Sequence, residues 1–250
     1  MTEPLLVTDR LVKRFGGLLA TDTVSIDVKH GEIHALIGPN GAGKTTLVSQ
    51  LTGGLATDSG TIRFLGRDVT RLPIHARVRL GLARSFQITS VLRDFSALEN
   101  VALAQRAHRG HSFRFLTDVR RDTARTEAAR RGLATVGLEA RAETPAAALS
   151  HGEQRQLEIA MALGGEPRLL LLDEPMAGMG PEESQRMVGL LRGLKQRCGM
   201  LLIEHDMEAV FALADRITVL VYGRAIATGT PAEIRANAEV RRAYLGEETA

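Results

Sequence analysis

One glycine-rich segment constrains the fold of this 250-residue chain more than any other feature. Residues 38–45 read Gly-Pro-Asn-Gly-Ala-Gly-Lys-Thr and satisfy the pattern G-x-x-x-x-G-K-[ST]. The apolar run 33–37 before them predicts a buried strand, and residues 45–52 after them predict a helix that stops at a glycine pair. A loop between a strand and a helix is the context in which this motif cradles phosphates. We therefore predict a nucleoside triphosphate site, since a chance match in a glycine-rich turn is disfavoured by the full motif and its context.

Each residue type in this segment has a role in holding phosphate. The glycines let consecutive backbone N–H groups wrap the phosphates, and the helix N-terminus adds positive potential. We expect Lys44 to reach the β- and γ-phosphates, the Thr45 hydroxyl to ligate Mg²⁺, and Thr46 to donate to the α-phosphate. The expected ligands are thus ATP and Mg²⁺. The predicted nucleotide-binding residues of the segment are Gly38, Pro39, Asn40, Gly41, Ala42, Gly43, Lys44, Thr45 and Thr46.

A second apolar run ends in two carboxylates. Residues 169–172 are four leucines, and Asp173 and Glu174 follow them. A buried strand delivers these acids to the C-terminal edge of a sheet, where open α/β folds bind nucleotides. There Asp173 can hold Mg²⁺ directly or through water, and Glu174 can polarise an attacking water as general base. Two solvated acids at a strand end are the alternative, which the phosphate loop makes the weaker interpretation.

The rest of the chain predicts an α/β fold with an inserted helical part. Strand-like runs occur at 25–28, 61–65, 200–203 and 217–222, and helical segments separate the later ones. This alternation predicts a mainly parallel sheet that is covered on both faces. Between 88 and 162 the periodicity is helical with no convincing strand, so we interpret this stretch as an inserted lobe.

Composition excludes several classes of protein. Lys and Arg number 32 against 29 acids, and the net charge of +3 is too small to argue for nucleic acid, while 4% aromatic residues offer few stacking platforms. The single cysteine, Cys198, excludes an internal disulfide framework, and we interpret it as a small filler rather than a nucleophile. No stretch approaches the roughly 20 apolar residues of a spanning helix, and no secretory signal is visible. We expect a soluble chain that reaches a membrane only through a partner.

A third motif resembles a known family. Residues 149–154, Leu-Ser-His-Gly-Glu-Gln, are similar to the Leu-Ser-Gly-Gly-Gln signature of ABC transporter nucleotide-binding subunits. The resemblance spans nearly the whole chain and implies one ABC-type P-loop NTPase cassette over 1–250. It implies a core at 1–87 and 163–250, with an N-terminal antiparallel β portion, and a helical subdomain at 88–162 that carries the signature.

The same resemblance implies a site shared between two protomers. In the family, the signature serine and glycine grip ATP that is bound to the other protomer, across a two-fold interface. The matching residues are Ser150 and Gly152, which the sequence places at a helix N-terminus suited to phosphate. The expected assembly is therefore a dimer of cassettes, formed with a second copy or with a paralogous cassette.

Further positions match the family one by one. Gln87 resembles the glutamine that senses Mg²⁺ and the γ-phosphate, and His205 resembles the histidine that contacts the γ-phosphate and orients Glu174. A lone histidine after a strand would ordinarily be a surface or core residue, and only its position in this pattern favours a functional role. Phe15 resembles the aromatic residue that stacks on adenine, with a core phenylalanine as the alternative. The resemblance thus makes Glu174, His205 and Gln87 catalytic, and Thr45, Gln87 and Asp173 the metal-binding residues.

The sequence departs from the family pattern in two places. His151 and Glu153 stand where glycine and glutamine are commonest in the signature. Neither change removes Ser150 or Gly152, so we expect the phosphate contact to survive. Residues 177–180 read Ala-Gly-Met-Gly where Ser-Ala-Leu-Asp is usual, and the final glycine cannot supply the carboxylate that helps couple the two sites in the family.

Softer motifs resemble the subgroup that energises uptake of branched-chain or other hydrophobic amino acids. They are the signature variant and residues 83–87, 177–183 and 242–246. The resemblance implies an ATPase motor on the cytoplasmic face of the plasma membrane, docked to integral-membrane permease subunits that work with a periplasmic substrate-binding protein. No nucleic acid partner is expected. The alternatives are a soluble ABC ATPase of translation or DNA repair, and an export or lipid-transport cassette.

An arginine-rich run lies in the predicted helical lobe, between residues 106 and 131. It could face anionic lipid headgroups near a membrane. We favour a solvated helix face, because acidic residues are interspersed among the arginines. The arginines concerned are Arg109, Arg114, Arg120, Arg121, Arg125, Arg130 and Arg131.

Overall fold

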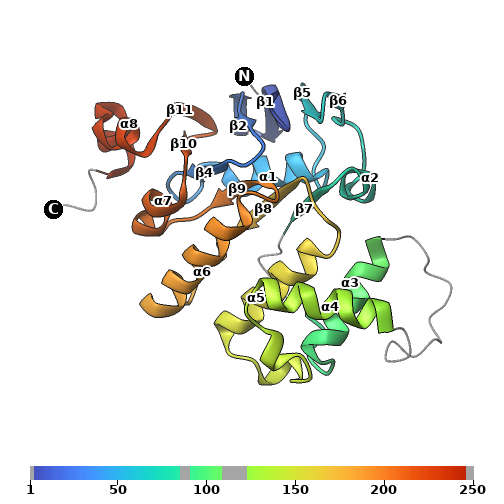
Figure 1. The fold of residues 1–250 in the computed structure, drawn as a ribbon. Coiled ribbons are helices and arrows are strands. Elements are labelled where there is room, and N and C mark those ends of the chain that lie inside the picture. The colour runs from blue at the N-terminus through green and yellow to red at the C-terminus, as the bar shows by residue number, and fades with distance from the viewer. Residues whose placement is uncertain (1–2, 85–90, 109–122, 246–250) are drawn as a thin grey trace.

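The computed structural model describes residues 3–84, 91–108 and 123–245, and its central element is a six-stranded sheet. The strand order is β11-β10-β4-β9-β8-β7, and every pairing is parallel except the one between β10 and β11. The predicted α/β class with a mainly parallel core is therefore confirmed (Figure 1). The strands are β4 Ile33–Ile37, β7 Leu82–Arg84, β8 Leu169–Asp173, β9 Gly199–Ile203, β10 Arg216–Val221 and β11 Arg224–Gly229.

A second, antiparallel sheet comes from the N-terminal part of the chain. Its order is β2-β1-β5-β6, and β3 pairs with β1 beside that path. It corresponds to the N-terminal antiparallel portion that the family resemblance implies. The predicted strand at 25–28 is shorter than expected, since only its last two residues pair. The strands are β1 Leu6–Phe15, β2 Leu18–Val24, β3 Asp27–Val28, β5 Ser59–Phe64 and β6 Arg67–Asp68.

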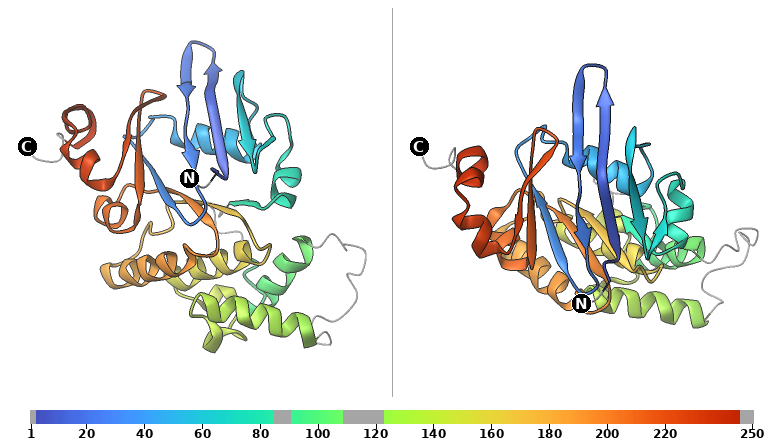
Figure 2. Two further views of the ribbon diagram at one scale, coloured as in Figure 1. Left: turned by 45° about the horizontal axis from the view of Figure 1, so that its top comes forward. Right: turned by 90° about the horizontal axis from the view of Figure 1, so that it is seen from above.

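Different layers cover the two faces of the six-stranded sheet. The antiparallel sheet and helix α1, Lys44–Thr52, lie on one side, and α6, Pro181–Leu194, lies on the other (Figures 1 and 2). The first four positions of β8 are apolar because both faces of the strand are covered: Leu169 and Leu171 belong to the core that contains α1, while Leu170 and Leu172 belong to the core that contains α6. Successive side chains of a strand point to opposite faces, so a strand that is covered twice is buried at every position.

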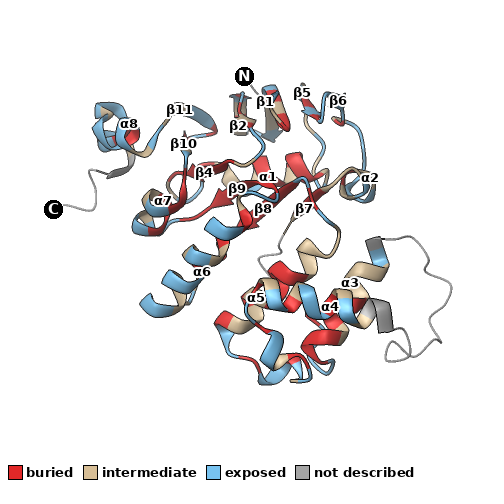
Figure 3. Cartoon of the chain, in the orientation of Figure 1, coloured by how far each residue is buried: buried red, intermediate tan, exposed pale blue. Residues whose placement is uncertain are grey.

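The helical lobe projects from the sheet on the side of α6 (Figure 1). Between residues 88 and 162, the described part contains helices, two 3₁₀ turns and one isolated bridge. The buried faces of the helices continue into the core below the sheet (Figure 3). The elements are α3 Ala97–His108, α4 Thr123–Thr135, the 3₁₀ turns Glu139–Arg141 and Ala146–Ala148, and α5 His151–Leu163.

The remaining helices are short, and the one at Met207–Leu213 packs against β4 and β10 on a face of the six-stranded sheet. The C-terminal elements lie at the end of the six-stranded sheet away from the helical lobe (Figure 1). Within the described ranges, no helix combines the length and the apolar character that a membrane crossing requires. These elements are α2 Ile74–Arg79, α7 Met207–Leu213, α8 Pro231–Ala236, α9 Ala238–Val240 and a π-helical turn Arg241–Leu245.

Three parallel strands end at one edge of the six-stranded sheet and position the candidate site there. Strand β4 pairs with β9, which pairs in turn with β8, and the last residue of β8 lies opposite Ile203. Parallel strands present their carboxyl ends on the same side. The loop after Ile37, the acids at the end of β8 and the histidine after β9 are thereby brought to one edge.

Candidate functional site

The phosphate loop leaves β4 with a backbone that only glycine adopts without strain. Gly38 has a φ of 151° and Gly43 a φ of 101°, and Gly43 caps the N-terminus of α1. A Cβ atom on Gly38 would clash with the carbonyl oxygen of Leu220, and one on Gly43 with that of Ala20. The loop is therefore held between β2 and β10 with no room for a side chain at these two positions, which leaves its backbone amides to face a ligand.

The Lys44 side chain folds back over the loop. Its ammonium nitrogen donates to the carbonyl oxygens of Gly38 at 2.5 Å and Pro39 at 3.1 Å. Burial lowers the pKa of Lys44, and the Glu174 and Asp173 carboxylates oppose that shift. The half-buried ammonium thus lies where the loop and the two acids converge. In this position the ammonium can contact the phosphate oxygens of a nucleotide bound at the loop.

Asp173 at the end of β8 is 4% exposed and forms an ion pair with Arg84 of the neighbouring strand β7. The Arg84 Nη2 atom lies 2.8 Å from Asp173 Oδ2. Sequence reasoning did not assign Arg84 a role in the site. The available signal was its place within the motif 83–87, but the pairing of β7 with β8 is what delivers it to the acid.

Glu174 and His205 face each other at the same edge. The Glu174 Oε1 and His205 Nδ1 atoms are 3.7 Å apart, and the side chains are 31% and 63% exposed. Glu174 has a φ of 49°, and its N–H donates to the Ile203 carbonyl oxygen at 2.9 Å. A left-handed backbone at a non-glycine residue is costly and is held here by the flanking strands. The strained turn aims the carboxylate toward the histidine and toward solvent.

Glu204, the residue before this histidine, is a buried acid that sequence reasoning missed. It is 1% exposed, and burial raises the pKa of Glu204. Its Oε1 atom accepts from the Met176 amide at 2.8 Å, and its Oε2 atom accepts from the His205 amide at 3.1 Å. One carboxylate therefore joins the loop after β8 to the loop after β9. An acid directly before the histidine was the only signal in the sequence.

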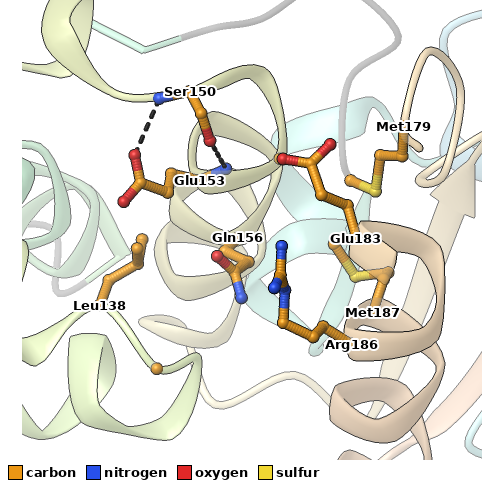
Figure 4. A pocket seen from close by; sticks show the side chains of 10 residues that line it. Leu138, Ser150, Glu153, Gln156, Met179, Glu183, Arg186 and Met187 are labelled. Atoms are coloured by element: carbon orange, nitrogen blue, oxygen red, sulfur yellow. Dashed lines mark hydrogen bonds between the residues drawn. The ribbon is translucent and has the colours of Figure 1, made fainter. Parts of the chain in front are cut away.

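The signature segment begins helix α5 with a complete capping box. Ser150 is the N-cap, and its Oγ atom accepts from the Glu153 amide at 3.2 Å. The Glu153 carboxylate accepts from the Ser150 amide at 2.8 Å, as Figure 4 shows. This reciprocal pair satisfies two of the amides that a helix N-terminus leaves free. The sequence predicted the helix and its serine, but it did not reveal the part that Glu153 plays.

A pocket of about 330 Å³ opens between α5 and α6 beside the signature. Its lining combines acidic, basic and thioether side chains (Figure 4). No described residue of the phosphate loop lines it. Within one chain, the signature and the phosphate loop therefore contribute to separate surfaces. The lining includes Ser150, Gly152, Glu153, Gln156, Met179, Glu183 and Arg186.

The other predicted site residues have mixed outcomes. Phe15 ends β1 with 48% of its surface exposed, and the Lys13 ammonium lies 5.7 Å from its ring centroid, so it is not a core phenylalanine. Its stacking on adenine stays a prediction. Gln87 lies outside the described residues. Gly180 is the N-cap of α6 and provides no side-chain cap.

Part of the arginine-rich run can be placed in the structure. Arg130 pairs with Glu143 at 2.7 Å, and Arg131 lies 4.0 Å from Glu127, with all four side chains exposed. This matches the favoured interpretation of a solvated helix face for these two residues. The remaining arginines of the run, Arg109, Arg114, Arg120 and Arg121, and the side chain of Arg125, lie outside what the structure describes.

No group of three or more His, Cys, Asp or Glu residues in the described part is arranged to hold a metal ion by itself. Mg²⁺ at nucleotide sites usually keeps several waters and takes one or two protein ligands together with phosphate oxygens. An exposed hydroxyl on Thr45 and a carboxylate on Asp173, at the edge where Lys44 converges, fit such a sparse ligand set. These two residues, together with Gln87 outside the described ranges, remain the predicted protein ligands.

Comparison with family models places most of the chain in a known group. Residues 21–177 match the model described as "ABC transporter". Residues 226–250 match a second model, described as "Branched-chain amino acid ATP-binding cassette transporter". The first match contains the phosphate loop, the signature and the two acids after β8. The second match contains the C-terminal tail.

Individual proteins resemble the chain over its full length. The high-affinity branched-chain amino acid transport ATP-binding protein LivG of Salmonella typhimurium is 41% identical, with 99% of this chain and 100% of the relative covered. Its counterpart BraF of Pseudomonas aeruginosa is 40% identical with the same coverage. A crystal structure of an ATP-binding cassette of an ABC transporter, in its ADP conformation, is 30% identical with a TM-score of 0.88, covering 98% of this chain and 100% of that one.

Proposed function

This chain belongs to the ABC transporter ATP-binding family, and from that premise we propose that it is the ATP-hydrolysing motor of an importer for branched-chain or other hydrophobic amino acids. The observation that carries the ATPase role is the convergence of Lys44, Asp173, Glu174 and His205 on one sheet edge. The substrate class is supported by the names of the relatives and by the C-terminal match at residues 226–250.

In the proposed site, the chain binds ATP through the loop amides and Lys44. Glu174 is 3.7 Å from His205 and accepts a proton from the attacking water, while the histidine holds its carboxylate in place. Thr45, Asp173 and Gln87 would hold Mg²⁺, which neutralises charge on the phosphates when bound. Catalysis then rests on positioning and on fixed charges rather than on covalent chemistry.

We further propose that the complete site needs a second cassette. Ser150 and Gly152 line a pocket to which the described phosphate-loop residues do not contribute, so the signature of one chain is available to the nucleotide of another. The partner is a second copy or a paralogous cassette. A capped serine at a helix N-terminus suits a γ-phosphate, because the amides and the dipole both favour negative charge.

The membrane role is proposed to come through partners. The motor would dock on integral-membrane permease subunits at the cytoplasmic face of the plasma membrane, and these would receive substrate from a periplasmic binding protein. We propose that the permease docks beside Gln87, which lies outside the described residues, and that Gln87 links this docking to the γ-phosphate. ATP binding would then change the affinity for the permease, and permease docking would change the affinity for ATP by the same factor.

Reconstitution tests this function. The chain is combined in lipid vesicles with candidate branched-chain amino-acid permeases and their binding protein, and both ATP hydrolysis and leucine uptake are followed. We expect the permeases to stimulate hydrolysis, and we expect Glu174→Gln to abolish hydrolysis and uptake while ATP still binds. Glu182→Gln, at an exposed position in the first turn of α6, serves as the matched control.

Two other outcomes would contradict parts of the proposal. Stimulation by ribosomes or DNA, with none from any permease, would support a soluble-pathway ATPase and remove the transport role. Stimulation by export or lipid-transport permeases alone would remove the amino-acid assignment. In either case, loss of hydrolysis in Glu174→Gln would leave the ATPase assignment intact.

A further inference from the structure

The signature of this chain carries a negative charge at the place where a phosphate is proposed to bind. Glu153 stands where glutamine is commonest in the family, and its Oε2 atom lies 2.8 Å from the Ser150 amide. A second acid is close, since the Glu183 carboxylate would lie 2.9 Å from a Cβ atom on Gly152. Carboxylates beside a polyphosphate repel it, because both are negatively charged. The repulsion becomes stronger when water is excluded from the site.

Arg141 lies against the first of these acids. Its Nε atom donates to Glu153 Oε1 at 3.0 Å, and its Nη2 atom approaches Glu153 Oε2 at 3.4 Å. A guanidinium that engages both carboxylate oxygens fixes their orientation as well as their charge. The pair is partly buried, with 43% of the arginine side chain and 25% of the glutamate side chain exposed. The arginine comes from the 3₁₀ turn Glu139–Arg141, outside the signature itself.

Glu153 also holds Ser150 in place, through its backbone amide and through its carboxylate. With Glu153 in the capping box, Ser150 Oγ accepts the Glu153 amide, and the Ser150 amide donates to the carboxylate. A serine hydroxyl has one proton and two acceptor positions, so this arrangement leaves the proton to donate to a phosphate oxygen. Ser150 is exposed and in position to do so.

From this geometry we propose that Arg141 is a positioning residue of the shared ATP site. It neutralises Glu153, and thereby lets a signature with an acid in it receive the γ-phosphate of the nucleotide on the other protomer. The inference rests on the proposed function, because it requires that Ser150 faces a second cassette. Arg141 acts through Glu153 and makes no contact with the nucleotide itself.

The test measures ATP-driven dimerisation in the Glu174→Gln background, where hydrolysis does not empty the site. Analytical ultracentrifugation over a series of ATP concentrations gives the concentration for half-maximal dimer formation. We expect Arg141→Ala to raise that concentration by about tenfold, because it leaves a carboxylate without its cation. Arg141→Lys keeps the positive charge, so its ATP concentration for half-maximal dimer formation should stay close to that of the parent chain. Arg130→Ala breaks an exposed arginine–glutamate pair of the same lobe and should change nothing.

The decisive variant combines Arg141→Ala with Glu153→Gln. Glutamine keeps an oxygen for the Ser150 amide but carries no charge, so the double variant should dimerise like Glu153→Gln alone. A double variant as defective as Arg141→Ala would overturn the proposal, since the arginine would then act directly or only through stability. An unchanged midpoint in Arg141→Ala would overturn it as well. Failure of the parent Glu174→Gln chain to dimerise with ATP would instead remove the shared site, and this inference with it.

Discussion

The buried Glu204 carboxylate accepts a hydrogen bond from the Met176 amide at 2.8 Å, and this bond joins the two loops that carry the proposed base and its histidine. The second oxygen of Glu204 accepts from the His205 amide. Both oxygens are therefore engaged by backbone donors in a site that water hardly reaches. We therefore expect this side chain, together with the bond from the Glu174 N–H to the Ile203 carbonyl oxygen, to set the separation of Glu174 from His205.

Glu204→Gln is expected to slow ATP turnover at least about tenfold while the affinity for ATP changes less than about twofold. The glutamine amide group places a donor against one of the two backbone N–H groups, so one loop loses its anchor. Steady-state hydrolysis and calorimetric nucleotide binding separate the two effects. Glu208→Gln, an exposed change near the start of α7, should leave both values as they are. Wild-type turnover in Glu204→Gln would show that the bond does not position the site.

Ser150→Arg is expected to block the ATP-driven dimer with nucleotide affinity of the single chain nearly unchanged. The bulky cation would fill the space that we propose for the γ-phosphate of the other protomer, while the described phosphate-loop residues do not line this pocket. Dimer formation and hydrolysis are compared with binding of ATP by calorimetry. Continued hydrolysis at the normal rate would mean that each chain completes its own site.

Gly43→Ala is expected to abolish ATP binding and to lower the free energy of unfolding by at least about 2 kcal/mol. Gly43 has a φ of 101°, and a Cβ atom there meets the Ala20 carbonyl, so the loop or strand β2 must move. Urea unfolding and nucleotide titration measure the two losses.

Gly189→Ala is the matched control for this substitution. Gly189 lies inside α6, is exposed and has open space at the Cβ position, so alanine should stabilise the chain by up to about 1 kcal/mol. Equal effects of the two substitutions would contradict the geometry described for the phosphate loop.

We expect His34 in β4 to make the free energy of unfolding fall in mild acid. The ring is fully buried, with Nε2 2.8 Å from the Thr218 hydroxyl and Nδ1 3.3 Å from Arg216. Burial lowers the pKa of His34 to about 4, although the Glu32 and Asp27 carboxylates act in the opposite direction. Because the folded pKa lies below the ordinary value of 6.5, the unfolded chain binds more protons between these two pH values.

The free energy of unfolding should therefore lose up to about 3 kcal/mol from this residue as pH falls from 6.5 to 4. Above pH 6.5 its contribution is fully present, and below pH 4 it changes no further. Urea unfolding at a series of pH values should show a shallower decline for His34→Gln than for the unaltered chain. His75→Gln, at an exposed position, should keep the full decline. Equal slopes in all three proteins would exclude His34 as the titrating group.

Strand prediction from the sequence was most accurate where burial was continuous, although β5, predicted at 61–65, is buried only at alternate positions of its second half. β4, β8 and β9 are buried at every position, so continuous apolar runs in the sequence were sufficient to predict them. β1 and β11 were missed, because their burial is irregular and their pairings contain register shifts. An alternating pattern that breaks at a bulge no longer has a strand period.

The sequence by itself determined the chemistry whose parts are contiguous: the phosphate loop before α1, the acids that end β8, and the signature serine that caps α5. Each depends on neighbouring residues in one local conformation, so a short motif is sufficient to recognise it, although the signature was recognised only by its resemblance to the ABC family. Only the tertiary structure decided which polar groups meet across the chain. Arg84 reaches Asp173 across 89 residues, Met176 reaches Glu204 across 28, and Arg141 reaches Glu153 from another turn. Strand register and helix packing create these pairs, and neither is encoded in any short stretch of the chain.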